Sequence, residues 1–311
     1  RILSSSEIKK CGGKIMLYFI MDDFFKNVFP KLGTPEVWDI YNKFYYKPNQ
    51  KILQRHFSRW NEFQIKKLKN KVNKWEMSDF INVIEAVEAF DGSIVKDIVE
   101  KSENWLGEIN NLEIYFIIGD FRSGIYIDRY ENKNIIVIAF EFVGQYGKTE
   151  EVLLPALSHE LFHLYHYSRL DNKEINRKDS FTKLLVDDGL ASYFAHMINP
   201  KYDMEKILFY SKEQLDIIKS NEQMYWQEIF QAMQSKSLNE CILLFNAPKK
   251  MWQEKLSDIP NWPPRISYYY GYKIIEYYIR ENGEKYIKDL MFIRPEYIIS
   301  ESKYLEELKK Q

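Results

Sequence analysis

Cysteine is nearly absent from this chain, which has only Cys11 and Cys241 among its 311 residues. Two cysteines that lie far apart in sequence cannot form a disulfide framework or a cysteine-based zinc site. Their small number favours a reducing compartment. No signal peptide is recognisable either, although one removed ahead of residue 1 would leave no trace. The sequence therefore predicts a cytoplasmic protein.

An excess of charge of one sign is also lacking, because the chain has 44 Lys and Arg residues and 45 Asp and Glu residues. Without a basic excess there is no overall attraction to nucleic acid, and we expect no nucleic-acid partner. The one local basic run, from Lys66 to Lys74, is interpreted as the solvated face of a helix rather than a binding patch. A run of ~18 apolar residues is missing as well, so we expect no membrane span.

The first residues also lack an initiating methionine, because the chain begins with Arg1. Gly12-Gly13 precede Met16 at the distance of a ribosome-binding sequence, if their codons are GGAGGT. We therefore interpret Met16 as the native start and residues 1–15 as a translated leader or a remnant of cloning, outside the fold. Other glycine codons in the gene would contradict this interpretation.

The patterns that are present predict an α+β protein that is mainly helical. Residues 16–110 are interpreted as an N-terminal helical region, in which Ser78 is the N-cap of a helix that Asp91-Gly92 ends. Residues 111–311 are interpreted as a catalytic region with a small sheet followed by helices. No internal repeat or low-complexity tract interrupts either region.

Short β-branched apolar runs predict the sheet, at residues 113–118 and 135–140, and residues 125–130 alternate more loosely as a third strand. Because the first two runs are continuously apolar, we expect these strands to be covered on both faces. Five helices are expected further on, over residues 150–168, 182–198, 203–217, 222–235 and 268–282, with an irregular loop over 246–264.

Histidine is scarce, yet two of the five histidines form the segment His159-Glu160-Leu161-Phe162-His163. On a helix a step of four residues is about one turn, so both imidazoles leave the same face ~6 Å apart along the axis. That spacing lets two ring nitrogens reach one Zn²⁺. Glu160 would then act as a general base on zinc-bound water. The alternative is a helix with two unrelated surface histidines, which is improbable with so few histidines.

Two nearby residues bear on this site. Proline is tolerated in the first turn of a helix but not in its interior, so Pro155 predicts a helix that begins near Leu154. His166 lies about 10 Å beyond His159 along the axis, which is too far for it to share the ion. We interpret it as a supporting or surface residue.

A catalytic zinc ion has three protein ligands and one open position, so a third ligand must lie elsewhere in the chain. Acidic candidates downstream are Glu174, Asp179, Asp187 and Asp188. The last two interrupt an otherwise apolar helical segment, where an unpaired carboxylate is costly. We expect Asp188 to be the ligand, with Asp187 as the next candidate. The small Gly189 would let this helix approach the first one closely.

These segments resemble a known group, the bacterial family of predicted Zn-dependent proteases of the gluzincin type. The family's pattern of H-E-x-x-H, E-G-x-A-x-Y and G-Y-Y-x-G-Y is matched by His159-Glu160-Leu161-Phe162-His163, Asp188-Gly189-Leu190-Ala191-Ser192-Tyr193 and Ser267-Tyr268-Tyr269-Tyr270-Gly271-Tyr272. The resemblance covers about residues 112–282, including Arg122-Ser123-Gly124. Asp188 stands where the family has Glu, and Ser267 where it has Gly. The shorter Asp requires its helix to lie closer to the metal.

The resemblance implies a zincin-like fold with an HExxH active-site helix, and hydrolysis of a peptide or protein substrate. It also implies that a tyrosine across the cleft, Tyr268 or Tyr269, donates to the oxyanion of the intermediate. The alternative is that these tyrosines only pack in the core. By analogy, strand 135–140 would offer an edge to which an extended peptide adds.

The resulting prediction is a zinc metallopeptidase. His159, His163 and Asp188 would hold Zn²⁺, Glu160 would be the general base, and Tyr268 or Tyr269 would polarise the scissile carbonyl. Three alternatives stay open: a zinc-binding protein that serves a partner without proteolysis, a zinc hydrolase of a non-peptide amide or ester, and a helical protein with a fortuitous motif. The sequence indicates neither the substrate nor the oligomeric state.

Overall fold

The computed structural model describes residues 6–10, 13–59, 63–122, 124–169, 181–234, 263, 265–283, 286–308 and 310. These residues form two compact units. Unit 1 contains residues 1–100 and 108–153, and unit 2 contains residues 101–107 and 154–311. The predicted fold class, α+β and mainly helical, is confirmed. The loop expected over residues 246–264 lies almost entirely outside the described residues.

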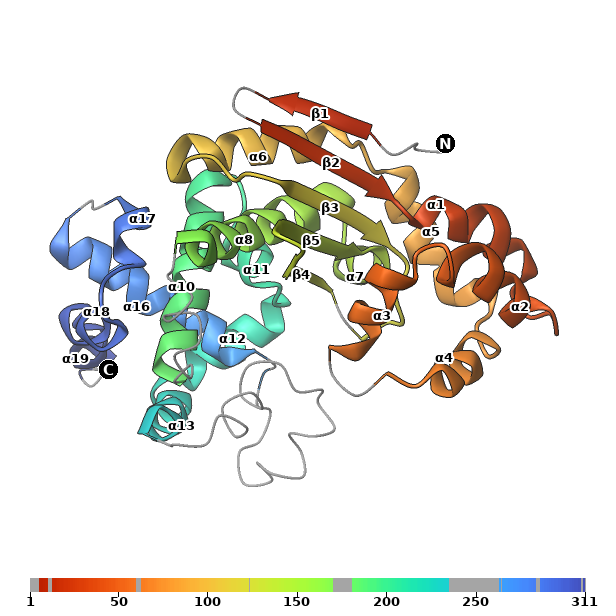
Figure 1. The fold of residues 1–311 in the computed structure, drawn as a ribbon. Helices are drawn as coiled ribbons and strands as arrows, with labels where there is room; N and C mark the ends of the chain where they lie inside the picture. Colours follow the sequence, from red (N-terminus) through yellow and green to blue (C-terminus); the bar gives the residue numbers. More distant parts are fainter. Residues whose placement is uncertain are drawn as a thin grey trace. The chain divides into compact units, whose positions relative to one another are not determined.

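Unit 1 is built on a five-stranded sheet in the order β1-β2-β3-β5-β4 (Figure 1). β2 pairs with β3 and β3 with β5 in parallel, whereas β1 and β4 pair antiparallel with their neighbours. The strands are β1 (Ser6–Lys10), β2 (Gly13–Phe19), β3 (Leu112–Ile117), β4 (Ile125–Tyr130) and β5 (Lys133–Ala139). The three strands predicted from residues 113–140 are present, but β5 lies inside the sheet, so the expectation that it forms an edge is wrong.

The first two strands come from a segment that sequence patterns assigned to a leader and to a helical region. Residues 6–10 and 13–19 pair with each other, and Ile15 to Phe19 pair with Leu112 to Phe116 of β3. The apolar run of β2 is too short for its periodicity to distinguish a strand from a helix. Its partner lies some 95 residues further on, so only the tertiary pairing makes it a strand.

The two faces of the sheet differ. On one face Leu17, Ile114 and Ile136 are fully or almost fully buried. On the other face the paired residues Tyr18 and Tyr115 are only half-buried. The expectation that the two apolar runs are covered on both faces is confirmed apart from Tyr115, because Ile117, Ile135 and Val137, which lie on the same face as Tyr115, are buried.

The helices of unit 1 precede the sheet strand β3 or follow β5. Where Ser78 was expected as an N-cap, Glu76 and Asp79 form a capping box instead. The helical elements are α1 (Met21–Asp23), η1 (Phe24–Val28), η2 (Phe29–Lys31), α2 (Val37–Tyr41), η3 (Asn42–Tyr46), α3 (Gln50–Ser58), α4 (Ile65–Val72), η4 (Met77–Phe80), α5 (Ile81–Glu88), α6 (Ser93–Leu106) and α7 (Phe140–Tyr146).

Unit 2 is helical in its described part. The helix predicted over residues 203–217 is two helices, α11 and α12, because Phe209 adopts a left-handed conformation between them. The elements are α8 (Thr149–Arg169, which begins in unit 1), α10 (Phe181–Ile198), α11 (Met204–Leu208), α12 (Lys212–Ser220), α13 (Glu222–Gln234), α16 (Ile266–Asn282), α17 (Ile287–Leu290), α18 (Pro295–Glu301) and α19 (Tyr304–Leu308).

Helix α8 begins earlier than Pro155 predicted. It starts at Thr149, whose hydroxyl donates to the Ala86 carbonyl at 2.9 Å, and Pro155 lies inside it. The expected start near Leu154 is therefore wrong. Proline removes one backbone hydrogen bond from a helix interior, and the apolar side chains Val152, Leu153 and Leu157, all buried, pack the helix around it.

Helices α10 and α16 cross at two glycines. A Cβ at Gly189 would lie 2.3 Å from the Gly271 carbonyl oxygen, and one at Gly271 would lie 2.3 Å from the Leu185 carbonyl oxygen. No side chain fits at either position, so both must be glycine for the backbones to touch. The expectation that Gly189 serves the approach to the motif helix is wrong, because its close neighbour is α16.

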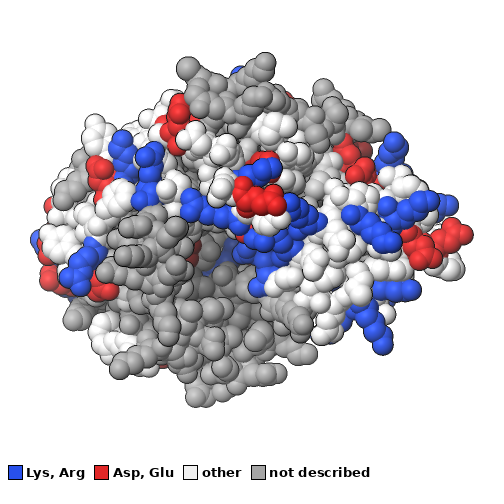
Figure 2. All heavy atoms as spheres, in the orientation of Figure 1, with Lys and Arg blue, Asp and Glu red and all other residues white. Residues whose placement is uncertain are grey.

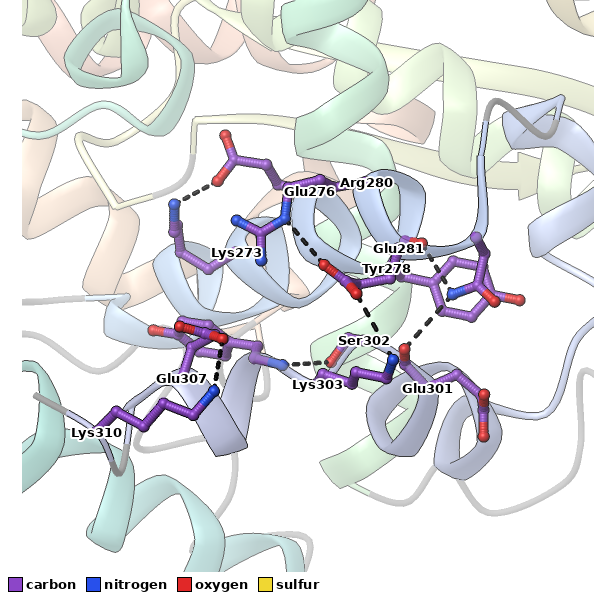
Figure 3. Close-up of polar contacts among 12 residues, drawn as sticks. Lys273, Glu276, Tyr278, Arg280, Glu281, Glu301, Ser302, Lys303, Glu307 and Lys310 are labelled. Carbon is purple, nitrogen blue, oxygen red and sulfur yellow. Dashed lines mark hydrogen bonds and ion pairs between the residues drawn. The ribbon is translucent and has the colours of Figure 1, made fainter.

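The end of α16 is tied to the last two helices by polar contacts (Figure 3). The Asn282 amide donates to the carbonyls of Tyr278 and Glu301 at 3.0 and 3.4 Å. Glu281 pairs with Arg280 and Lys303 at 3.2 and 3.6 Å on the surface. These contacts position α16, which carries Tyr268 near its first turn.

Candidate metal centre

Helix α8 presents His159 and His163 on one face, as their spacing predicts. Their Nε2 atoms lie 3.0 Å apart, and each residue is 8% exposed. A neutral imidazole has one donor and one acceptor, so these two nitrogens hydrogen-bond to each other only when the two rings adopt different tautomers. Both nitrogens also face a third group.

That third group is Asp188, from α10. Its Oδ1 lies 3.1 Å from Nε2 of His163 and 3.5 Å from Nε2 of His159. Burial alone would raise the pKa of Asp188, but hydrogen bonds and charge from the two histidines outweigh it and lower this pKa to about 2. The carboxylate is therefore ionised at neutral pH and available as a ligand.

The three side chains fit one zinc ion by chemistry and by spacing. Two imidazole nitrogens and one carboxylate oxygen are a donor set that Zn²⁺ takes. Tetrahedral ligands at ~2.0–2.1 Å from an ion stand about 3.4 Å from one another, and the observed separations are 3.0, 3.1 and 3.5 Å. Within the described part of the chain, this is the one group of three such side chains whose ligand atoms converge.

Two neighbours orient His159. The hydroxyl of Ser192 lies 3.3 Å from Nδ1 of His159, which fixes the ring so that Nε2 faces Asp188. The ring of Tyr268 stacks on His159 with centroids 5.6 Å apart and an angle of 21°. Sequence reasoning missed Ser192, although it lies four residues after Asp188, one helical turn along the same face.

Tyr268 and Tyr269 have different environments. Burial, and then the charge of Asp188, raises the pKa of Tyr268 well above its ordinary value, so its phenol stays protonated beside the cluster. Tyr269 lies in another network, where its hydroxyl and that of Tyr304 donate to Glu222 at 2.8 and 2.5 Å. Of the two tyrosines singled out from the sequence, only Tyr268 contacts a member of the cluster.

Asp187 and His166, the other acid and histidine considered near the motif, are not members of the convergent group. Asp187 pairs with Lys183 at 2.5 Å and lies 3.8 Å from His166. His166 is 1% exposed, which rules out a surface role, and burial lowers its pKa to about 3. Glu160 is half-buried one residue after His159. Glu174 and Asp179 lie outside the described residues.

Unit 1 has a second buried pairing of histidine and carboxylate, at the ends of β3 and β5. Glu141 accepts hydrogen bonds from the backbone N–H groups of Gly119 and Phe121 at 3.0 and 3.1 Å. Burial raises the pKa of Glu141 to about 7 and lowers that of His56 to about 4. His56 Nδ1 lies 3.1 Å from the Tyr126 hydroxyl, and its Nε2 has no hydrogen-bond partner in the described residues.

Comparison with known proteins points to one family. The family model GldB_lipo, described as the gliding motility protein GldB, matches residues 18–306. The match includes both units and every residue of the metal cluster. No curated protein and no solved structure matches the chain significantly.

This match overturns the reading drawn from the motifs. The gliding motility family is not a family of zinc proteases, so the assignment to the predicted Zn-dependent proteases is wrong. The prediction of a metallopeptidase that hydrolyses peptide bonds is contradicted with it, and the match supports neither alternative zinc function. The error arose because H-E-x-x-H specifies two metal ligands and a nearby acid, which is a property of a site rather than of a family.

The predicted cytoplasmic location is wrong on the same ground, because the family label designates a lipoprotein of the cell envelope. A low cysteine count and an unrecognised signal are weak indicators of compartment. None of the described helices is both long and apolar enough to cross a membrane.

Proposed function

This chain belongs to the family of the gliding motility protein GldB, and on that basis we propose that it is a lipoprotein of the bacterial cell envelope that takes part in gliding motility. The single observation that supports this proposal is the family match, which extends over residues 18–306 of 311. Because the match includes both compact units, the proposed role belongs to the whole chain rather than to one part of it.

The test of this role is genetic. Deletion of the gene from its host should abolish the gliding of single cells on glass and the spreading of colonies on agar. The wild-type gene on a plasmid should restore both, and Gly92→Ala, a change with only an ordinary contact of 3.8 Å to Phe19, serves as a matched control. Cells that glide normally without the gene would contradict the proposal. Fractionation should place the protein with the envelope membranes.

Within this role, we propose that His159, His163 and Asp188 bind one Zn²⁺. The support is their convergence, with three ligand atoms within 4.8 Å of one another, and the orienting contact from Ser192. A bound ion would connect α8 to α10 and add its binding free energy to the stability of unit 2. An ion bound there would offset the negative charge of the half-buried Asp188 carboxylate.

The metal proposal is tested on the purified wild-type protein. Elemental mass spectrometry should find about one zinc per chain, and a chelator should lower the midpoint of thermal unfolding. Addition of zinc should reverse that shift. A protein that contains no zinc and does not take it up when loaded would contradict the metal proposal and leave the motility proposal untouched.

We also propose that unit 2 has the zincin-like arrangement of a motif helix followed by a helix with the third ligand. The support is that His159 and His163 lie on α8 and Asp188 on α10. This proposal concerns the fold alone, because an arrangement of helices does not specify an activity. A crystal structure of the zinc-loaded protein, compared with known zincins, tests it.

A further inference from the structure

A cavity of about 490 Å³ lies in unit 1, on the half-open face of the sheet. Its floor is formed by residues of β2, β3 and β5, and its walls by α1, α3 and the β4–β5 turn. Sites for small ligands in proteins typically have volumes of ~300–1,000 Å³ and combine aromatic walls with a few fixed polar groups. The cavity has the size and the composition of such a site, and it lies in a different unit from the metal cluster.

Two tyrosines form an aromatic platform in this cavity. Tyr18 and Tyr115 occupy paired positions on β2 and β3, and their rings stack with centroids 4.5 Å apart and an angle of 10°. Both donate to the buried carboxylate of Glu113, at 3.4 and 2.6 Å. Burial and this carboxylate raise the pKa values of both phenols, so they stay protonated. The rings are therefore held in place while their outer surfaces stay half-exposed.

Two of the acidic residues in the lining form ion pairs with lysines of the lining. Glu113 forms an ion pair with Lys133, with an N···O distance of 2.7 Å, and Lys51 forms one with Glu131 at 2.9 Å. Figure 2 shows the wider pattern, with Lys and Arg side chains gathered over α3 and β4 and carboxylates beside them. The lining contains three basic residues and four acidic ones. A charged ligand would meet like charges, whereas a neutral ligand with several hydroxyls would find both donors and acceptors.

We propose that this cavity binds a neutral carbohydrate, with a pyranose ring packed against the face of Tyr18 that is not stacked on Tyr115. A pyranose has apolar C–H faces that pack on aromatic rings, as other apolar groups do. Its hydroxyls lie around the edge of the ring, and Asn49, Lys51 and Glu131 of the cavity lining offer them donors and acceptors. This inference goes beyond the motility role and does not depend on the metal.

Other ligand classes fit the cavity less well. A phosphate or carboxylate that paired with Lys133 would have to displace Glu113, at the cost of leaving a buried carboxylate unpaired. An ammonium ligand would compete with Lys51, which already lies 4.2 Å from the ring centroid of Tyr130. A neutral ring breaks neither pair.

The experiment titrates the full chain with neutral trisaccharides by calorimetry: maltotriose, cellotriose, xylotriose, mannotriose and triacetylchitotriose. The deacetylated, cationic chitotriose is the matched charged probe, because it keeps the same backbone. We expect at least one neutral sugar to bind with a Kd below about 1 mM. We expect Tyr18→Ala to weaken that binding by about tenfold or more, and Tyr115→Phe, which keeps the ring, to weaken it less. Tyr286→Ala, at a tyrosine that is 66% exposed in unit 2, should leave it unchanged.

Three results would overturn the proposal. The first is the absence of binding for all five neutral sugars up to about 10 mM. The second is binding of the charged probe as tight as that of triacetylchitotriose, which would indicate electrostatic association. The third is binding that survives both Tyr18→Ala and Tyr115→Leu, which would place the sugar elsewhere. Thermal melts of every variant verify the fold.

Discussion

The two units each bury a histidine near a carboxylate, but the two clusters are built differently. In unit 1 the oxygens of Glu141 are used by backbone N–H groups, and His56 turns its Nδ1 to Tyr126. In unit 2 the ring nitrogens of His159 and His163 and an oxygen of Asp188 face one point, 3.0 to 3.5 Å apart. Burial and shifted pKa values occur in both clusters. Convergence of ligand atoms occurs only in the second, and it is what indicates a metal site.

The largest expected effect is a difference in zinc binding between a variant of the unit 2 cluster and a variant of the unit 1 cluster. Removal of one ligand in His163→Ala should weaken zinc binding by about a hundredfold or more, since two of three protein ligands remain. His56→Gln, the matched change in unit 1, should leave the zinc content as in the wild type. Elemental mass spectrometry and competition with a coloured chelator measure both. Equal loss in the two variants would mean that the convergent group is not the binding site.

The next effect concerns the packing that holds Asp188 in place. Gly271→Ala puts a methyl group 2.3 Å from the Leu185 carbonyl oxygen, so α10 and α16 must separate. We expect a loss of about 3 kcal/mol in the free energy of unfolding, typical of overpacked cores. Urea unfolding followed by circular dichroism measures it. Gly92→Ala, whose methyl group would make an ordinary contact, is the control and should change stability little.

The buried Glu141 and His56 of unit 1 should make the free energy of unfolding depend on pH. The pKa of Glu141 is raised to about 7 from 4.5, so the folded state keeps a proton that the unfolded state loses, and stability falls as pH rises between these values. His56, with its pKa lowered to about 4 from 6.5, acts in the opposite sense, and stability rises over that range. The two effects offset each other between about pH 4.5 and 6.5.

Glu141→Gln removes only the first effect. Relative to the wild type, its unfolding free energy should increase by up to about 3 kcal/mol as pH rises from 4.5 to 7. His56→Gln should show the opposite difference. Urea midpoints at steps of pH measure both variants. Parallel pH profiles for wild type and Glu141→Gln would mean that folding does not raise the pKa of this carboxyl.

The smallest effect tests how the metal ligands are oriented. Ser192→Ala removes the hydroxyl that lies 3.3 Å from Nδ1 of His159 while leaving all three ligands. We expect zinc affinity to fall by about tenfold, the range for supporting groups around metal ligands. Chelator competition measures the affinity, and Ser168→Ala, in α8 and with its hydroxyl donating to the Tyr165 carbonyl, is the control. An unchanged affinity would show that packing against Tyr268 alone holds the ring.

The sequence by itself was enough to determine the local elements whose signals lie within one helical turn or one strand. It predicted α10 and α16 nearly to their ends, the C-terminal end of α8, and the placement of two imidazoles on one face, because helical periodicity and the i, i+4 spacing are local properties. It also identified Asp188 as the acid that the structure places beside them. The protein family, however, could not be identified from motifs that describe only one site.

Only the tertiary structure decided what depends on partners distant in sequence. The pairing of β2 with β3 made a strand of residues 13–19, and the crossing of α10 with α16 explained Gly189 and Gly271. The same holds for Ser192 beside His159, for Tyr268 rather than Tyr269 near the cluster, and for the tyrosine platform over Glu113. Each is a contact between side chains or backbones whose proximity is set by packing; apart from the i, i+4 spacing of Asp188 and Ser192, no local pattern of residues indicates these contacts.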